Sequence, residues 1–304
     1  MKITSLEHLQ EYTTVSNSFT FAKLKSFEQT SITKYLKQWF STDLLDQVFG
    51  YQSALEGSIE SKAYESLMYA HVAFTMLEYS QQGEVIISDL GFVRAENEHT
   101  KSAYAQQMKM YRESQEDNGF MYVSSLIDIF DSLPATFPEW TASPGYAERN
   151  TLLVKTAKIF NNIQRLYRMN TTFIEIIPSI KEGQDLHLNP FFGKTLIDLL
   201  VVDSGLTANQ QIVRGYLITA LVNLSMGISI EKGLVKLTPN GAMVIGHDSN
   251  TSKQLESSAM PERTAIPFKS YMDTGKRYID LAYKHAVESE IITPESYTAK
   301  RFWT

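Results

Sequence analysis

Residues 59–81 read IESKAYESLMYAHVAFTMLEYSQ, and this stretch decides the fold of the first half of the chain. Its apolar side chains recur at steps of three and four residues, at Ile59, Ala63, Leu67, Ala70, Phe74 and Leu77. This spacing lines one face of an α-helix. The stretch therefore predicts a long helix whose apolar face, including Leu67, enters a core.

A second stretch of the same kind follows at residues 207–228. Apolar positions lie four residues apart there, at Ile212, Tyr216, Ala220, Leu224 and Ile228. Thr207 is a suitable N-cap because its hydroxyl can accept a free backbone N–H. Within these stretches, YAHVAFTM at 69–76 aligns with TALVNLSM at 219–226, at an offset of 150 residues.

Other blocks align in the same order along the chain. YLKQWFSTDLLD at 35–46 aligns with HLNPFFGKTLID at 187–198, at an offset of 152, and residues 85–93 align with 235–243 at 150. Gly119, Tyr122 and Pro138-Glu139 align with Gly275, Tyr278 and Pro294-Glu295 at 156. Internal similarity at one long period indicates a repeated structural unit. We therefore expect a tandem duplication.

The expected fold is mainly α with short β-hairpins, and each half follows the same plan. β-Branched residues around a tight-turn signal predict a hairpin near 84–95 and another near 234–245. Further helices are expected at 97–113, 119–132, 146–167, 251–259 and 267–289. A stretch rich in Pro, residues 133–145, is interpreted as a linker because proline interrupts helices. The predicted domains are residues 1–147 and 148–304.

The composition suits a globular chain of two domains: 304 residues, 43% hydrophobic and 12% aromatic. Zero Cys excludes thiol nucleophiles, disulfides and Cys-based zinc sites. The net charge of −6 gives no indication of electrostatic capture of nucleic acid. Residues 1–152 hold 11 basic and 20 acidic residues, whereas residues 153–304 hold 17 and 14. Such asymmetry bears on association.

No targeting or membrane-spanning segment is expected. Residues 1–8 lack the apolar core of a secretory signal, and runs such as 199–202 are far too short to cross a bilayer. We therefore expect a soluble protein that is made in a cytoplasm and makes no membrane contact.

Short patterns that suggest chemistry are weak in this chain. His285 and Glu288 lie one turn apart, as two metal ligands would, but a solvated helix face has the same pattern. Gly193-Lys194-Thr195 lacks the earlier glycine of a phosphate-binding loop, and we interpret it as a helix start. Ser31 and Lys34 form an S-x-x-K pattern without its K-T-G companion, and His71 falls within an apolar helix. We predict no catalytic residue, no cofactor and no metal ligand.

The segment SYTAKRFWT at 296–304 contains the one predicted interaction site. Arg and Trp are enriched in binding hot spots because each provides a large contact area and a polar group. Arg301, Phe302 and Trp303 are therefore candidate interface residues, the alternative being that the two aromatic rings pack on their own domain.

The layout resembles the head–tail connector proteins of tailed bacteriophages, also called neck or portal-adaptor proteins. The similarity is carried by FSTDLL at 40–45 and FGKTLI at 192–197, each followed by an alanine-containing helix at Ala70 and Ala220. The duplicated form, with KEG at 181–183 and NPFFG at 189–193, is most similar to proteins of phages that infect Bacteroidetes, crAss-like phages among them. The first half departs from the pattern because Ser41 stands where the second half has Gly193.

The resemblance implies a virion protein assembled in the host cytoplasm, with no enzyme activity and no cofactor. It implies a homo-oligomeric ring that binds the portal protein and other neck and tail proteins. DNA would pass through the ring without specific binding. Two alternatives remain open: a hydrolase or small-molecule-binding protein with a site between the halves, involving His187 and His285, and another structural protein of the virion.

Overall fold

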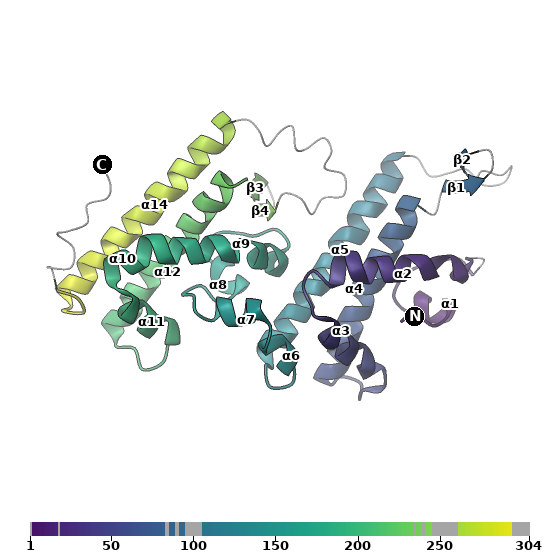
Figure 1. The fold of residues 1–304 in the computed structure, drawn as a ribbon, viewed down its shortest axis with the longest axis horizontal. Helices are drawn as coiled ribbons and strands as arrows, with labels where there is room; N and C mark the ends of the chain where they lie inside the picture. The colour runs from purple at the N-terminus through teal and green to yellow at the C-terminus, as the bar shows by residue number, and fades with distance from the viewer. Residues whose placement is uncertain are drawn as a thin grey trace. The chain divides into compact units, whose positions relative to one another are not determined.

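Two long antiparallel helix pairs organise the chain, one in each of two units, Met1–Ser143 and Pro144–Thr304 (Figure 1). The predicted domain boundary, after residue 147, lies four residues beyond this division. The computed structural model describes residues 2–17, 19–82, 85–88, 91–94, 105–233, 235–238, 241–244 and 261–293. The fold is mainly α, as predicted.

The first unit surrounds α4 (Ile59–Gln82) and α5 (Ala105–Ser132) with shorter elements. These are α1 (Leu6–Gln10), η1 (Phe21–Leu24), α2 (Lys25–Ser31), η2 (Ile32–Leu36), α3 (Thr42–Phe49), η3 (Gly50–Ser53) and α6 (Pro138–Thr141). Helix α4 is the centre of this unit, since α2, α3 and α5 all pack against it. Leu67 and Phe74 of α4 are buried, as the helical spacing predicts.

Contacts along α4 and α5 fix their antiparallel direction. Arg112 near the start of α5 donates to Ser80 near the end of α4. At the opposite ends of the two helices, the hydroxyl oxygens of Ser125 and Ser66 are hydrogen-bonded at 3.4 Å. Midway, a Cβ added to Gly119 would lie 2.5 Å from Cε1 of Phe74. The absence of a side chain at Gly119 therefore allows the two helices to approach closely.

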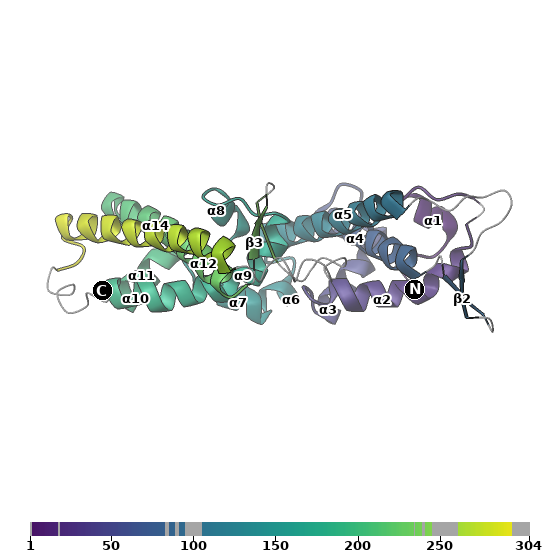
Figure 2. The same cartoon turned by 90° about the horizontal axis from the view of Figure 1, so that it is seen from above.

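The second unit is built around α12 (Ala208–Glu231) and α14 (Pro261–Glu288). Its other helices are α7 (Pro144–Arg149), α8 (Ala157–Asn161), α9 (Met169–Gly183), η4 (Gln184–Leu188), α10 (Asn189–Phe192) and α11 (Lys194–Val202). Figures 1 and 2 both show α12 lying along α14. A Cβ added to Gly275 of α14 would lie 2.7 Å from Cγ of the buried Leu224.

The start of α12 is fixed by a capping box. The Thr207 hydroxyl accepts from the backbone N–H of Gln210, and the Gln210 side chain accepts from the backbone N–H of Thr207. This arrangement satisfies two donors that a helix start otherwise leaves free. Thr207 is therefore the N-cap, as predicted.

Two short antiparallel strand pairs join the long helices. β1 (Val85–Ser88) pairs with β2 (Gly91–Arg94), with Val85 opposite Arg94. β3 (Val235–Thr238) pairs with β4 (Gly241–Val244), with Val235 opposite Val244. The four strands fall within residues 84–95 and 234–245.

Several predicted elements are wrong. One continuous helix, α5, covers the described part of the region where a break was expected between residues 113 and 119. The predicted helix at 146–167 is interrupted: α7 ends at Arg149, Thr156 caps the short α8, and α8 ends at Asn161. Arg168, with a left-handed φ of 52°, is the N-cap of α9. The expected linker, residues 133–145, begins directly after α5 ends at Ser132 and includes the boundary between the two units, but it also contains α6 and the start of α7. The predicted helix at 251–259 lies outside the described residues.

Helical spacing within the predicted helices at 146–167 and 207–228 places Ile163 and Ile212 on the inward faces, but both are exposed, at 37% and 44%. Ile163 lies just beyond α8, which is shorter than the predicted helix at 146–167. Ile212 lies in the second turn of α12, close to the start of that helix.

Among the described residues, α12 alone has the length and apolar composition of a membrane-crossing helix. A search for uninterrupted apolar runs does not find this helix, because polar residues divide its apolar residues into short runs. Its buried residues, including Val213, Leu217, Leu221 and Leu224, form part of the core of the second unit. A core helix of this kind passes the same test of length and composition.

Candidate functional site

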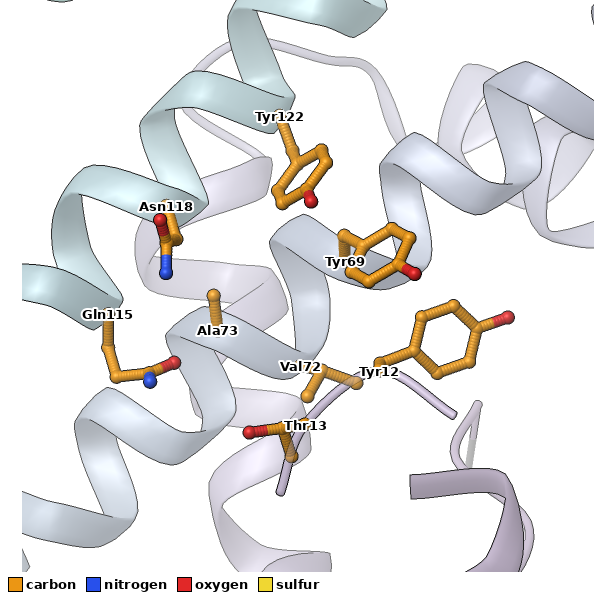
Figure 3. A pocket seen from close by; sticks show the side chains of 8 residues that line it. All are labelled: Tyr12, Thr13, Tyr69, Val72, Ala73, Gln115, Asn118 and Tyr122. Carbon is orange, nitrogen blue, oxygen red and sulfur yellow. The ribbon is translucent and has the colours of Figure 1, made fainter. Parts of the chain in front are cut away.

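A pocket of about 130 Å³ opens on the first unit between α4, α5 and the segment after α1 (Figure 3). Tyr12, Tyr69 and Tyr122 line one side of it, and we call it the tyrosine pocket. Gln115 and Asn118 of α5 line another side. Thr13, Val72 and Ala73 complete the lining.

Aromatic contacts hold the three tyrosines together. The rings of Tyr69 and Tyr122 are stacked, with centroids 4.6 Å apart and planes 13° from parallel. Tyr12 meets Tyr69 edge-on at 4.9 Å. Offset-stacked and edge-to-face pairs are favourable arrangements of aromatic quadrupoles. The pocket is therefore bounded by rings that are already positioned against each other.

Burial and nearby carboxylates both act on Tyr12. Burial raises the pKa of Tyr12, and the Tyr64 hydroxyl and the carboxylate of Glu11 raise it further, with a smaller contribution from Glu65. Glu11 and Glu65 are both exposed at the surface. The two carboxylates would attract a cation, whereas burial, the largest cause of the raised pKa of Tyr12, disfavours a charge of either sign.

The size of the pocket limits what it can hold. Sites for cofactors and drug-sized ligands measure about 300–1,000 Å³. The tyrosine pocket, at about 130 Å³, has room for one large side chain or a group of that size. Amide groups and tyrosine rings in such a small recess are typical of sites that receive an anchoring side chain from a protein partner.

A second polar feature of the first unit is buried between α2 and α4, and we call it the Glu28 network. The Ser31 hydroxyl lies 3.0 Å from Nδ1 of His71 and 2.9 Å from the Thr75 hydroxyl. Nε2 of His71 lies 3.4 Å from Oε1 of Glu28, which also accepts the backbone N–H of Ile3 at 2.7 Å. The network therefore attaches the N-terminal segment to the helical core.

Ser31, His71 and Glu28 are hydrogen-bonded in the sequence serine, histidine, carboxylate that catalytic triads use. Their burial, however, prevents contact with a substrate. Ser31 and His71 have no exposed surface, and the Ser31 hydroxyl also bonds to the backbone carbonyl of Glu28 at 2.9 Å. A catalytic serine must reach the reacting atom. We therefore interpret the network as structural, with His71 fully buried in the core.

A neighbouring carboxylate is buried with its own partners. Oε1 of Glu78 accepts from the Tyr35 hydroxyl and from Nζ of Lys34, both at 2.7 Å. Burial and the hydrogen bond to Glu78 raise the pKa of Tyr35. Lys34 thus pairs with Glu78 and does not act on Ser31, so the S-x-x-K pattern has no catalytic geometry here.

The Glu28 network makes the first unit sensitive to acid. Burial lowers the pKa of His71, and although burial of Glu28 opposes ionisation, hydrogen bonds from His71 and Ile3 lower the pKa of Glu28. As the pH falls below about 6.5, His71 therefore becomes protonated in the unfolded chain, while it stays neutral in the folded chain, where its pKa is lower. We expect the free energy of unfolding of this unit to fall as pH drops from about 7.5 to about 5.5.

Tryptophan fluorescence can measure this effect in the first unit alone. In a Trp303→Phe background, the remaining tryptophans, Trp39 and Trp140, both belong to the first unit. Urea unfolding at each pH is compared with His71→Gln, whose amide replaces the hydrogen bonds without titrating near neutrality. A pH dependence equal in the two chains would contradict the assignment to His71.

The residues singled out from the sequence lie in different places. Arg301, Phe302 and Trp303 lie outside the described residues. His187 in η4 and His285 in α14 both belong to the second unit. Burial lowers the pKa of His187, with Lys276 contributing. Gly193 starts α11 with a φ of 76°, so Gly193-Lys194-Thr195 is a helix start as expected.

In the part of the chain that the structure describes, no cluster of three or more His, Asp or Glu residues is arranged to hold a metal ion. Glu288, the suggested companion of His285, instead lies 3.9 Å from Nζ of Lys284.

The tyrosine pocket is not apparent from the sequence, because its lining comes from three separate segments. Part of the lining could be predicted, because Gln115, Asn118 and Tyr122 are spaced three and four residues apart and so lie on one face of α5.

One comparison with known proteins gives a match. A model described as "Family of unknown function (DUF6712)" matches residues 26–150, a span that covers most of the first unit. No curated protein matches the chain, and no solved structure does.

Proposed function

We propose that the chain is a tandem duplication of one helical module and acts as a structural component of a virion, a connector that forms a ring between head and tail. In this proposal it binds the portal protein and neck proteins around the DNA channel and catalyses no reaction. The observation that carries the proposal is the repeated construction of the two units.

Equivalent elements support the duplication. α4 and α12 each have 24 residues, and α5 and α14 each have 28. The π-helical turns η2 and η4 begin at Ile32 and Gln184, which are 152 residues apart, the offset at which these regions align in sequence. π-Helical turns are rare, so two at one alignment position favour common descent of the units over coincidence.

Packing at equivalent positions supports it further. Gly119 faces Phe74 in the first unit, and Gly275 faces Leu224 in the second. The two glycines are 156 residues apart and the two apolar residues 150 apart, again as in the sequence alignment. Thr75 donates to the carbonyl of His71 at 2.7 Å, and its counterpart Ser225 donates to that of Leu221 at 2.6 Å.

The two cores differ where the Glu28 network lies. At the positions that correspond to Glu28, Ser31 and His71, the second unit has Ile180, Gly183 and Leu221, all buried. If the units are duplicates, one arrangement of helices holds a polar cluster in the first unit and apolar residues in the second. Such divergence disfavours pairing of a helix from one unit with the wrong partner from the other.

The step from duplication to connector rests on the sequence resemblance and on charge. A ring is built from heterologous contacts, in which one surface of a subunit meets a different surface of the next. Residues 1–152 are acidic and residues 153–304 slightly basic, which gives such a contact complementary sides. An acidic lumen would also allow DNA to slide, because its phosphates would find few cations.

Size-exclusion chromatography with light scattering tests the proposed assembly. The chain is measured alone and after mixing with the portal protein. We expect a homo-oligomer of one defined mass, or a defined complex on the portal. A chain that stays monomeric and never binds portal or tail components would contradict the proposal.

A further inference from the structure

We propose that the tyrosine pocket of one copy binds the segment Lys300–Trp303 of a second copy, with the Arg301 guanidinium entering among the tyrosine rings. This inference rests on the proposed ring, and it names a contact that would join neighbouring subunits. The pocket and the segment each occur once per chain, so contacts between them can propagate from copy to copy.

The shape and lining of the pocket favour a single guanidinium group. Its volume of about 130 Å³ is too small for a nucleotide or a cofactor but has room for one long side chain. A guanidinium group is attracted to aromatic rings, and Tyr12, Tyr69 and Tyr122 line the pocket, with Tyr69 and Tyr122 stacked on each other. Its several N–H donors match the amide oxygens of Gln115 and Asn118.

Charge favours a cation at this place. The exposed carboxylates of Glu11 and Glu65 are close enough to act on Tyr12, and they would attract a cation that approaches the pocket. Lys300 and Arg301 carry two adjacent positive charges, and Phe302 and Trp303 follow them directly. A side chain that enters a pocket and aromatic neighbours that cover its rim are the usual composition of a binding hot spot.

The pocket distinguishes the first unit from the second, as a contact between unlike surfaces requires. By the alignment offsets, the second unit has Thr219 in place of Tyr69 and Tyr271 in place of Gln115. One unit of the chain therefore carries the lining of the pocket, and the other precedes the segment that would occupy it.

Photo-cross-linking of the full chain tests the contact. Phe302→benzoylphenylalanine places a reactive group beside Arg301, and irradiated protein is separated on a denaturing gel. We expect a covalent product of twice the 34.5 kDa chain mass, in which peptides around residue 302 are joined to peptides containing Tyr12, Tyr69 or Tyr122. A pocket cross-link within a single chain, a dimer linked elsewhere, or no product at the pocket would overturn the proposal.

Variants in the same background identify the groups involved. Arg301→Ala is expected to lower the yield of the pocket cross-link about tenfold, and Arg301→Lys less, because an ammonium group stacks and pairs less well. Glu11→Gln, at an exposed position, is expected to lower the yield without affecting folding. Thr33→Ala is the matched control, since Thr33 lines a different surface pocket with Gln29, Thr30 and Lys34, and it should leave the yield unchanged.

The result separates this contact from the ring itself. Light scattering on the unmodified chain reports assembly independently of the cross-link. A ring whose cross-links lie elsewhere would refute the contact and leave the ring standing. An intermolecular pocket cross-link in a chain that forms only open oligomers would support the contact and refute the closed ring.

Discussion

Phe74→Ala is expected to destabilise the first unit by about 3–5 kcal/mol. The Phe74 side chain is fully buried in the middle of α4, stacked on Tyr35 with centroids 4.4 Å apart and edge-on to Phe120 at 5.2 Å. Its removal leaves a cavity that the long helices cannot close, because α5 already approaches to contact at Gly119. Urea unfolding followed by the fluorescence of Trp39 and Trp140, in the Trp303→Phe background, measures the loss.

Phe74→Leu is the matched control, because leucine is the residue at the corresponding position, Leu224, of the second unit. If the two units share one packing arrangement, leucine should be accommodated with a loss well below that of alanine, roughly 1–2 kcal/mol. Equal losses for leucine and alanine would contradict the equivalence of the two positions.

Gly119→Ala and Gly275→Ala are each expected to destabilise their own unit by about 1–3 kcal/mol. In an exposed helix interior the same substitution stabilises by up to about 1 kcal/mol, because glycine is a poor helix former. At these two positions the added Cβ would lie 2.5 Å from the Phe74 ring and 2.7 Å from Cγ of Leu224. Neither obstacle is the free end of a flexible chain, since both side chains are completely buried.

Gly215→Ala is the control variant, for which the stability change is expected to have the opposite sign. Gly215 lies in α12 at an exposed position, and nothing lies within 4 Å of the Cβ that alanine would add. We expect this variant to be more stable than the parent chain. Hydrogen exchange followed by mass spectrometry assigns each change to a unit. Stabilisation by all three alanines would show that the helix pairs are not in close contact.

Relief of the clash can be tested in the same series. Gly119→Ala combined with Phe74→Leu should cost less than the sum of the two single losses, because leucine vacates part of the space that the new methyl group needs. Strict additivity would mean that the two residues do not share this contact.

Long helices could be predicted from the sequence because their signals are local. The spacing of Ala63, Leu67, Ala70 and Phe74 sets the buried face of α4, and Thr207 alone marks the start of α12. The continuity of α5 could not be predicted in this way. Gly119 looks like a break in sequence, and its role depends on Phe74, which lies 45 residues away.

The polar features depend on contacts between distant segments. The partners in the Glu28 network are separated by 40 to 44 residues where they join α2 to α4. The tyrosine pocket combines a loop residue, Tyr12, with residues of two helices, and no single window of sequence contains it. The irregular segment between α7 and α9 was predicted as one helix because its apolar residues have helical spacing, whereas the structure ends α7 at Arg149 and caps the short α8 with Thr156.

Imaging of the purified chain by electron microscopy, alone and bound to the portal protein, tests the central claim most directly. The proposed function predicts closed rings of one size with an open centre, coaxial with the portal where the two are mixed. Monomers at every concentration, or particles without rotational symmetry both alone and with the portal, would contradict it.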